Sequence, residues 1–310
     1  MQKTGYGLIR KGVRILDSAI NLVVLLLFLL CLSVGGYALW DSHQIYQEAN
    51  RQRYEQYKPT ADDSLSFQEL QQINPDVFGW LTIYGTNIDY PLVQGESNDT
   101  YLNTSVTGEN VLSGSIFLDC RNQRDFSDFN SIIYGHHMDK QAMFGELDQF
   151  VDDTFFAGHQ YGELYYNGTA HGLELFAFLE TDAYNSIYTP AVVKAEDQEE
   201  YISSLWQQAS QLRDIPVLPS DHIVLLSTCA SLETNGRYIL VAKISTTVYE
   251  NPFYEEAVTG EGVDWLSRVP VWLLAVMFLL AAGVLLMIIR RRKRSKRNEG
   301  SKNRTQEKEK

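Results

Sequence analysis

Cysteine is scarce in this chain of 310 residues, which contains only Cys31, Cys120 and Cys229. Three cysteines exclude the disulfide framework of a small secreted domain, so the fold must be stabilised by a hydrophobic core. The chain also lacks the motifs CxxC and HExxH and the ligand spacing of an EF-hand. We therefore expect no metal site and no cofactor.

Basic residues are rare in the middle of the chain. Residues 21–267 include 10 Lys and Arg but 35 Asp and Glu, whereas residues 268–310 include 12 Lys and Arg and 3 Asp and Glu. So acidic a region repels a phosphate backbone, which argues against a nucleic acid partner. The charge favours a basic partner such as a lysine-rich acceptor, although solubility explains it equally well.

Two stretches lack charged residues altogether, Ser18–Trp40 and Val269–Ile289, and each is long enough to cross a bilayer as a helix. Basic residues precede the first stretch, and the run RRRKRSKR follows the second. The positive-inside rule therefore places both termini in the cytoplasm and the middle outside. A cleaved signal peptide is the alternative for the first stretch. Its apolar run is too long for one and lacks a small-x-small exit, which favours an uncleaved anchor.

These features predict a cell-membrane protein with one extracellular domain. The predicted segments are a cytoplasmic N-terminus (1–17), a transmembrane helix (18–40), an extracellular helical tether (41–66), the main domain (67–250), a linker (251–268), a second transmembrane helix (269–289) and a basic cytoplasmic tail (290–310). Within the tether, the polar, helix-forming residues Ser42–Tyr57 predict a helix that lifts the domain off the membrane.

From Gly79 onward, short apolar runs are separated by Gly, Asn and Asp, a pattern typical of an all-β barrel with few helices. A short helix is predicted over Phe67–Ile73, ended by Asn74 and Pro75. A longer helix is predicted over Asp197–Leu212, because apolar residues recur there at helical spacing. Its predicted buried face comprises Tyr201, Ile202, Leu205, Trp206, Ala209 and Leu212.

Two apolar runs rich in β-branched residues, Ile223–Leu226 and Tyr238–Ile244, predict an antiparallel hairpin with a polar loop over Ala230–Gly236. Cys229 closes the first strand and Arg237 opens the second, so a thiol and a fixed positive charge become neighbours. The thiolate is the reactive form of cysteine and a nearby cation favours it, so Cys229 is a candidate nucleophile. The plainer alternative is a core cysteine beside a solvated arginine.

Another short strand, Ser131–Tyr134, runs into Gly135, His136 and His137. Glycine lets the chain turn sharply, so the histidine after it can point from a strand end into a cleft. A cysteine with a distant histidine is the composition of a cysteine acyl-transfer site, in which histidine is the general acid and base. This second stretch strengthens the case for catalysis at Cys229.

Together these segments resemble the sortases, the membrane-bound cysteine transpeptidases of Gram-positive bacteria. The resemblance rests on IIYGHH (132–137), LLSTC (225–229) and the arginine on the following strand. Upstream, the segments FGWLTIYGTNIDY, PLVQG, GSIFLD and MFGEL follow the order typical of class B sortases. The resemblance covers residues 67–247, which is nearly all of the predicted extracellular domain.

The resemblance implies an all-β fold with short helices, a sortase-type closed barrel of about eight strands, flanked here by the two transmembrane helices. It implies that Cys229 attacks a carbonyl in the C-terminal sorting signal of a secreted protein, and that an amine then resolves the thioester. His136, which follows the Tyr-Gly pair as in the family, would transfer the protons. Arg237 would stabilise the oxyanion or hold the substrate backbone. The predicted helix Asp197–Leu212 would wall the groove for the sorting signal.

Four further residues are candidates for binding the substrate. Thr228 is a candidate to assist Arg237 at the oxyanion. Ser227 and Asn130 would contact the residues that react and hold them in place. His137 would line the groove instead of transferring protons, because the family's histidine is the one directly after Tyr-Gly.

The resemblance leaves two possibilities for the amine acceptor. Many class B sortases attach a surface protein to the peptide cross-bridge of cell-wall peptidoglycan, and some join pilins through a lysine side chain. A second membrane span is more usual among the pilin-polymerising enzymes. The Asp-Pro-aromatic lid that those enzymes usually carry is, however, missing from Ser42–Phe67. We therefore place wall anchoring ahead of pilus assembly.

Three other functions share parts of this pattern. A catalytically idle, membrane-tethered binding domain would lack Cys229, His136 or Arg237, whereas all three are present. A cysteine protease would pass the same thioester to water, and a purely structural scaffold would need none of these residues. Cys120 is expected to be a free, partly buried thiol, because a disulfide with Cys229 would consume the nucleophile.

Overall fold

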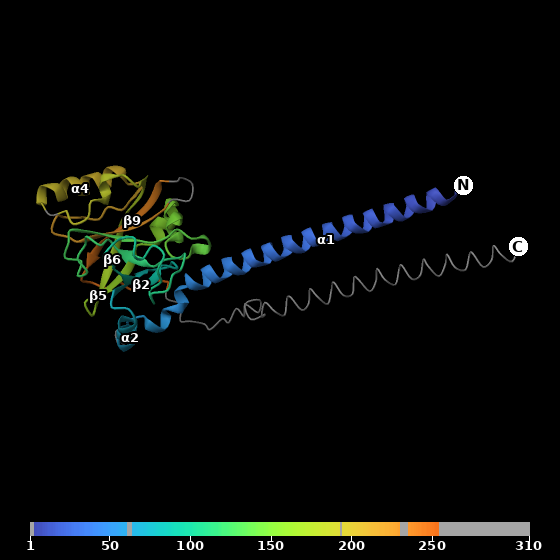
Figure 1. Ribbon diagram of the computed structural model, residues 1–310. Coiled ribbons are helices and arrows are strands. Elements are labelled where there is room, and N and C mark those ends of the chain that lie inside the picture. The colour runs from blue at the N-terminus through green and yellow to red at the C-terminus, as the bar shows by residue number, and fades with distance from the viewer. Residues whose placement is uncertain (1–2, 61–63, 193, 230–234, 254–310) are drawn as a thin grey trace. The chain divides into compact units, whose positions relative to one another are not determined.

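The computed structural model describes residues 3–60, 64–192, 194–229 and 235–253. The predicted second transmembrane helix, the basic tail after it and the hairpin loop residues 230–234 lie outside the described residues. Beyond the N-terminal helix, the described chain is built mainly from strands (Figure 1). These are β1 (Val77–Ile83), β2 (Asp89–Val93), β3 (Ile116–Leu118), β4 (Asn130–Tyr134), β5 (Tyr161–Tyr166), β6 (Thr169–Asp182), β7 (Gln211–Leu212), β8 (Ile223–Cys229) and β9 (Gly236–Ser245).

The helices of the described chain are short, apart from α1 and α4. The α-helices are α1 (Lys3–Glu48), α2 (Leu65–Ile73), α3 (Asp153–Gly158) and α4 (Ala195–Gln208). The 3-10 turns are η1 (Arg51–Arg53), η2 (Glu55–Tyr57), η3 (Asp139–Gln141), η4 (Gly145–Val151) and η5 (Ser186–Tyr188). Helix α2 confirms the helix predicted over Phe67–Ile73, and Asn74 ends it by donating its backbone N–H to the Leu70 carbonyl.

Eight strands close into a ring in the order β5-β1-β2-β3-β4-β8-β9-β6, because β5 pairs with both β1 and β6. Strand β7 is a ninth strand that pairs with β6 beyond the end of β5. The pairs β2–β3 and β4–β8 are parallel, and the other pairs are antiparallel. The closed eight-stranded barrel with few helices confirms the predicted fold class.

The strands around β8 are buried on both faces, because successive side chains alternate between the barrel interior and an outer layer. In β8, Val224 and Leu226 belong to the interior cluster, whereas Ile223 and Leu225 pack in a second cluster with residues of α4. We call this second cluster the outer cluster. Burial on both faces explains why these strands appear in the sequence as continuous apolar runs.

Helix α4 corresponds to the predicted long helix, but it ends at Gln208 instead of Leu212. Its buried residues are Tyr201, Ile202 and Leu205. The prediction was wrong for Trp206 and Leu212, whose exposed fractions are 43% and 50%. The cause is the free edge of β6 beyond β5. There Ser210 donates its N–H to the Phe178 carbonyl, and the next two residues pair with β6 as β7.

The helix predicted over Ser42–Tyr57 is wrong beyond Glu48, where α1 ends. The next residues turn onto the barrel, so that Ala49 and Tyr54 are buried in its core. Burying an aromatic ring is worth about 1.5–3 kcal/mol, which outweighs one more turn of an exposed helix. The chain after α1 is therefore part of the barrel's packing.

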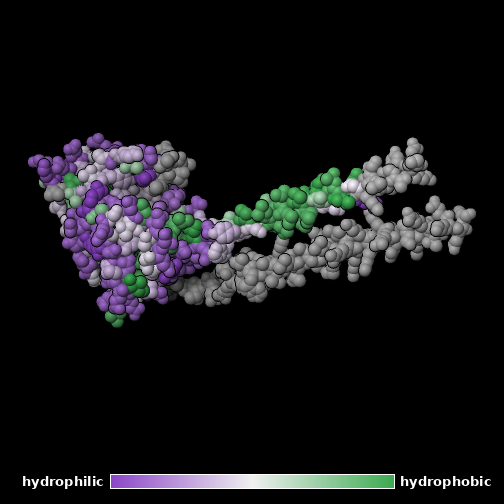
Figure 2. All heavy atoms as spheres, in the orientation of Figure 1, coloured by the Kyte–Doolittle hydropathy of each residue, from purple (hydrophilic) through white to green (hydrophobic). Residues whose placement is uncertain are grey.

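Within the described part of the chain, α1 is the helix long and apolar enough to cross a membrane, over Gly12–Glu48. It contains the predicted span Ser18–Trp40. Figure 2 shows hydrophobic residues gathered along α1, whereas the visible face of the barrel is mainly hydrophilic. An exposed apolar helix of this length fits membrane association.

Replacing Phe178 by alanine should destabilise the barrel strongly. Phe178 is fully buried, with its ring centroid 6.3 Å from that of Phe150 and 5.7 Å from that of Tyr238. We expect the free energy of unfolding to fall by about 3–5 kcal/mol, because the substitution leaves a cavity and removes the contacts that both rings make with Phe178. Urea unfolding of the full chain in detergent, followed by tryptophan fluorescence, measures it. As a control, Tyr184→Ala at a residue 85% exposed should change stability by less than about 0.5 kcal/mol. Equal effects of the two changes would contradict the assigned core.

Candidate active site

The predicted site begins where two parallel strands end together. Strand β4 runs beside β8 with Tyr134 opposite Ser227. The pairing extends one step further, since the Gly135 N–H donates to the Ser227 carbonyl at 3.2 Å. His136 and Cys229 are each two residues beyond the last paired position. The register therefore brings these two predicted residues to the same end of the barrel.

The other neighbour of β8 is β9, and the two form the predicted antiparallel hairpin. Cys229, the last residue of β8, lies opposite Arg237. The Arg237 side chain is half-buried, and its Nη1 donates to the Gly236 carbonyl at 2.8 Å. A guanidinium has five N–H donors, so this bond leaves others for a substrate oxygen. The Cys229 side chain lies outside the described part of the structure.

Gly135 is required by close packing. A Cβ at this position would lie 2.5 Å from Ile116 Cδ1 and 2.8 Å from the Phe144 ring. The backbone angle φ of Gly135 is not in the left-handed region, so the sharp turn expected there is not the reason for the glycine. Any side chain would push the segment that carries His136 away from β3.

His136 is held by a backbone carbonyl. Its Nε2 lies 2.7 Å from the oxygen of Leu102, in the connection between β2 and β3. A carbonyl oxygen only accepts, so Nε2 must carry a proton, and in the neutral ring Nδ1 is then the acceptor. Sequence reasoning gave the Leu102 carbonyl no role, because no side-chain pattern marks a backbone carbonyl 34 residues away.

His137 lies against η4, apart from the strand ends. Its Nε2 is 3.4 Å from Asp148 Oδ2, and its backbone forms a bridge with Met143. The side chain is only 15% exposed. Its predicted place in the substrate groove stays a prediction.

Ser227 is covered by two tyrosines. Its Oγ lies 2.7 Å from the hydroxyl of Tyr188 in η5, and the Tyr188 ring stacks on Tyr134 at 6.4 Å between centroids. Thr228, the next residue, is on the opposite face of β8 in the series of Val224 and Leu226. Its buried Oγ1 has no hydrogen-bond partner among the described residues. The structure thus separates the side chains of Ser227 and Thr228.

A buried carboxylate, Asp119, supports Tyr134 just before the glycine–histidine pair. The Tyr134 hydroxyl donates to Asp119 at 3.1 Å, Asn98 donates at 3.0 Å, and the Arg121 guanidinium donates twice, at 2.8 and 2.6 Å. Burial acts to raise the pKa of Asp119, but the hydrogen bonds from Arg121 and Asn98 outweigh it and hold the pKa below the usual value. Burial, together with the charge of Asp119, raises the pKa of Tyr134. Sequence reasoning gave Asp119 no role, although it closes the segment GSIFLD.

Asn130 lies at the other end of β4 and is fully buried. Its Nδ2 donates to the Thr189 carbonyl at 2.8 Å, and its Oδ1 accepts the Val192 N–H at 2.8 Å. The side chain therefore fastens the segment after η5 to β4. The structure does not bring Asn130 together with His136.

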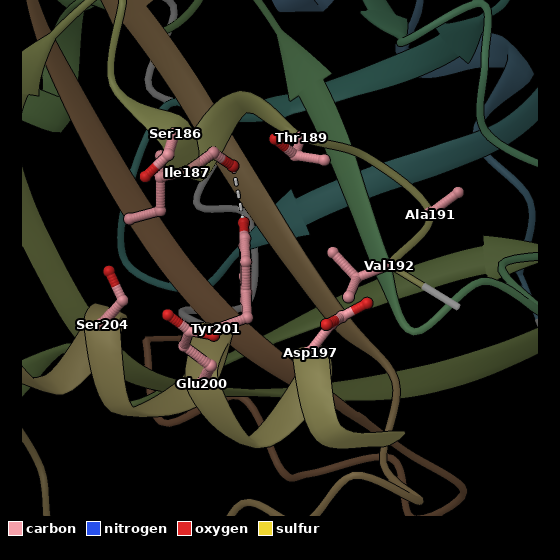
Figure 3. Close-up of a pocket in the computed structure, with 9 residues that line it drawn as sticks. All are labelled: Ser186, Ile187, Thr189, Ala191, Val192, Asp197, Glu200, Tyr201 and Ser204. Atoms are coloured by element: carbon pink, nitrogen blue, oxygen red, sulfur yellow. Dashed lines mark hydrogen bonds between the residues drawn. The ribbon is translucent and has the colours of Figure 1, made fainter. Parts of the chain in front are cut away.

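A pocket of about 440 Å³ lies between this segment and α4 (Figure 3). Tyr201 points across it from α4 and donates its hydroxyl to the Ile187 carbonyl at 2.7 Å. Asp197 and Glu200 add negative charge. The lining residues are Ser186, Ile187, Thr189, Ala191, Val192, Asp197, Glu200, Tyr201 and Ser204. None of the predicted site residues is among them, so the role of α4 as a groove wall stays a prediction.

Cys120 is a free and exposed thiol at the end of β3. The expectation that it is partly buried was wrong, because the side chain is exposed although Asp119 before it is fully buried. Its free state also excludes the alternative disulfide with Cys229. Among the described residues, no group of three or more His, Cys, Asp and Glu residues is placed to hold a metal ion.

Comparison with known proteins gives a consistent set of relatives, although no family model matches the chain. The sortase B of Listeria monocytogenes serovar 1/2a is 35% identical over 181 residues, which are 58% of this chain and 74% of that protein. The crystal structure of sortase B from the type II pilus of Streptococcus pneumoniae is 49% identical with a TM-score of 0.52, covering 58% of this chain and 99% of that one. A Streptococcus pyogenes class B sortase involved in pilus biogenesis is 41% identical with a TM-score of 0.54, covering 58% and 97%.

The lowered pKa of Asp119 predicts acid sensitivity. A carboxylate whose folded pKa lies below its unfolded value of about 3.9 stabilises the fold above that value. This stability is lost as the pH falls through the folded pKa. We expect the free energy of unfolding to fall more steeply from pH 5 to pH 3 in the unmodified protein than in Asp119→Asn. Urea unfolding at several pH values measures both slopes. The exposed Asp99→Asn should keep the original slope, and equal slopes for all three proteins would contradict the assignment.

Proposed function

The chain belongs to the sortase family of transpeptidases, and from this premise we propose that it is a class B cysteine transpeptidase with Cys229 as its nucleophile. The observation that carries the proposal is the register of three strand ends. Cys229 lies opposite Arg237, and the parallel strand on the other side leads into His136. The pairing of these three strands supports a nucleophile, a cation and a proton carrier at the same end of the barrel.

Strand alternation supports a common face for the three residues. One outer-cluster residue in each strand lies four positions from the proposed reacting residue: Ile132 before His136, Leu225 before Cys229 and Val241 after Arg237. Side chains alternate with a period of two, so an even spacing keeps the same face. By this spacing, Arg237 and position 229 of β8 belong to the same series as the outer-cluster residues, and His136 continues the series of β4 two residues beyond the end of that strand.

The proposed reaction has two halves. The Cys229 thiolate attacks a peptide carbonyl carbon, the C–N bond breaks, and His136 gives its proton to the departing amine. An amine then attacks the thioester, His136 takes the proton from it, and the C–S bond breaks as the new amide forms. A free thiol has a pKa of about 8.5, so a cation beside Cys229 favours the reactive thiolate at neutral pH. The hydrogen bond to Leu102 leaves Nδ1 of His136 to exchange these protons.

Arg237 is the proposed donor to the oxyanion. Its half-buried position strengthens a hydrogen bond to developing negative charge, because less water competes there. The Thr228 hydroxyl, predicted to assist, is on the interior face of β8 and is left out of this role. Ser227 is instead proposed to hold Tyr188 over the strand ends.

We propose that the barrel works outside the cell with both termini in the cytoplasm. The apolar helix α1 supports an anchor at the N-terminal side. The acidic middle and the basic residues after 289 support the orientation, because positive charge stays in the cytoplasm. The substrate is then a secreted protein that carries a C-terminal sorting signal.

Two acceptors remain candidates for the amine. Cell-wall peptidoglycan is favoured because the Asp-Pro-aromatic lid usual in pilin-polymerising sortases is missing from Ser42–Phe67. A pilin lysine is favoured by a separate observation, since two of the similar solved structures, at 49% and 41% identity, are described as pilus sortases. The higher identity of these two gives the pilin lysine the stronger support.

The nucleophile can be tested by trapping the thioester. The full chain in detergent micelles is incubated with a library of sorting-signal peptides and analysed by intact-mass spectrometry. We expect a peptide-sized adduct that is lost in Cys229→Ala and kept in the matched control Cys120→Ser. Arg237→Ala should slow its formation by roughly 10²–10³-fold, because the oxyanion loses its donor. If no peptide forms an adduct while iodoacetamide still alkylates Cys229, the chain is an idle binding domain.

The acceptor can be tested by competition for the thioester. A lysine-containing pilin-type peptide and a peptidoglycan fragment with a free cross-bridge amine are offered together to the loaded enzyme. We expect the lysine peptide to capture the acyl group at least about tenfold faster, because a dedicated acceptor site discriminates by its polar contacts. The same peptide with norleucine for lysine is the control and should capture nothing. Faster capture by the fragment would establish wall anchoring, and release to water alone would indicate a protease.

A further inference from the structure

The loop that follows His136 has an unusual backbone. Lys140, Gln141 and Met143 have φ angles of 58°, 60° and 54°, in the left-handed region that residues other than glycine rarely adopt. They are three of the six such non-glycine residues in the described chain. Conformations of this kind persist only where the surroundings hold them, and they gather at functional sites. We call residues 138–143 the strained loop.

The base of the strained loop includes the backbone of His136. The Phe144 N–H donates to the His136 carbonyl at 3.0 Å, and the residues just inside, His137 and Met143, form a bridge. Gly145 lies so close to the Met138 carbonyl that a Cβ there would collide with its oxygen. A shift of the loop would therefore move the peptide group of His136.

The loop base is tied to the end of the membrane helix by one buried hydroxyl. Tyr90 of β2 is 3% exposed. Its hydroxyl donates to the carbonyl of Ala49 at 2.9 Å and accepts the Met143 N–H at 3.0 Å. Ala49 is the first residue after α1. A path of hydrogen bonds thus runs from the end of α1 through Tyr90 to one of the strained residues.

The tip of the loop touches the same helix. Tyr46, in the last turn of α1, donates its hydroxyl to Asp139 Oδ2 at 3.3 Å. The Lys140 ammonium lies 4.4 Å from the centroid of the Tyr46 ring, within the range of a cation–π contact. The end of α1 therefore holds the loop at its base and at its tip.

We propose that the end of α1 sets the conformation of the strained loop and through it the orientation of the His136 ring. Tyr90 and Tyr46 are then positioning residues, since neither reaches the reacting atoms. This inference rests on the proposed function, because it assumes that His136 exchanges protons with Cys229. A displacement of about 1 Å at such a group is enough to slow proton transfer strongly.

The test compares tyrosine-to-phenylalanine changes that remove only a hydroxyl. Tyr90→Phe and Tyr46→Phe remove contacts with α1 or the loop. Tyr84→Phe is the matched control, because Tyr84 is also buried and donates to the Tyr249 carbonyl, far along the chain from the loop. All variants are made in the full chain with Cys31→Ala and Cys120→Ser, so that Cys229 is the only thiol.

The readout is the rate of Cys229 alkylation by iodoacetamide from pH 5 to pH 9 in detergent micelles. A well-placed imidazolium favours the thiolate, so His136→Ala should lower the rate at neutral pH and move the midpoint upward. Tyr90→Phe should move the profile part of the way, with about a threefold lower rate at pH 7, and Tyr46→Phe should move it less. Tyr84→Phe should leave it unchanged.

The outcomes separate the two proposals. A profile of His136→Ala equal to that of the unmodified protein would overturn the proposed pair of Cys229 and His136. If the His136→Ala profile is shifted while Tyr90→Phe has the same profile as Tyr84→Phe, only the proposed positioning by α1 is overturned, and the pair of Cys229 and His136 stands.

A second pair of variants applies if Tyr90→Phe fails to fold. Glycine adopts this φ without strain, so Lys140→Gly keeps the backbone conformation but removes the cation–π contact with Tyr46, and it should also move the profile toward that of His136→Ala. Asn167→Gly is the control, because it introduces glycine at a comparable φ of 50° in the turn between β5 and β6, and it should leave the alkylation profile unchanged. An unchanged profile in Lys140→Gly would overturn the inference independently.

Discussion

The pairing of β8 with β4 on one edge and β9 on the other is the constraint on which the site depends. Both faces of β8 are buried, one in the barrel and one in the outer cluster. A slip of one residue would move every apolar side chain of the strand to the wrong face. The register is therefore fixed by the whole core. His136, Cys229 and Arg237 are placed by that register and need no bond to one another.

Polar contacts add to the hydrophobic packing of the layer outside β4 and β8. Tyr188 bonds to Ser227 and stacks on Tyr134, while Asn130 fastens the segment after η5. Beneath Tyr134, the buried charge of Asp119 is compensated by Arg121. Removing one partner of such a network is costly, because the other is left buried without a hydrogen bond. Asp119, to which the acid sensitivity is assigned, thus also helps to hold Tyr134 and the Tyr188 ring stacked on it.

The sequence was sufficient for those parts of the fold that are coded locally. Continuous apolar runs predicted β4, β8 and β9, and the positions of Cys229 and Arg237 at strand ends followed from them. The end of α4 was missed, because the helical spacing continues to Leu212 while the free edge of β6 captures the chain first. Asp119 was missed because Tyr134, which it supports, lies 15 residues later, and the Leu102 carbonyl because His136 lies 34 residues later. The left-handed residues of the strained loop carry no glycine to mark them.

The end of α1 also bears on where the reaction takes place. The strained loop contacts Tyr46, and His136 is only three residues before Asp139, so at most about 11 Å of chain separates them. The Arg51 guanidinium donates to the Thr86 carbonyl in the turn after β1, and the Phe253 ring stacks on His159 next to Gly85 in that turn. Residues before and after the barrel in the described chain therefore contact one turn, and Asn87 of that turn donates to Gln141 of the strained loop at 3.2 Å. The loop after the proposed proton carrier is thus tied to the end of α1, the helix that fits membrane association.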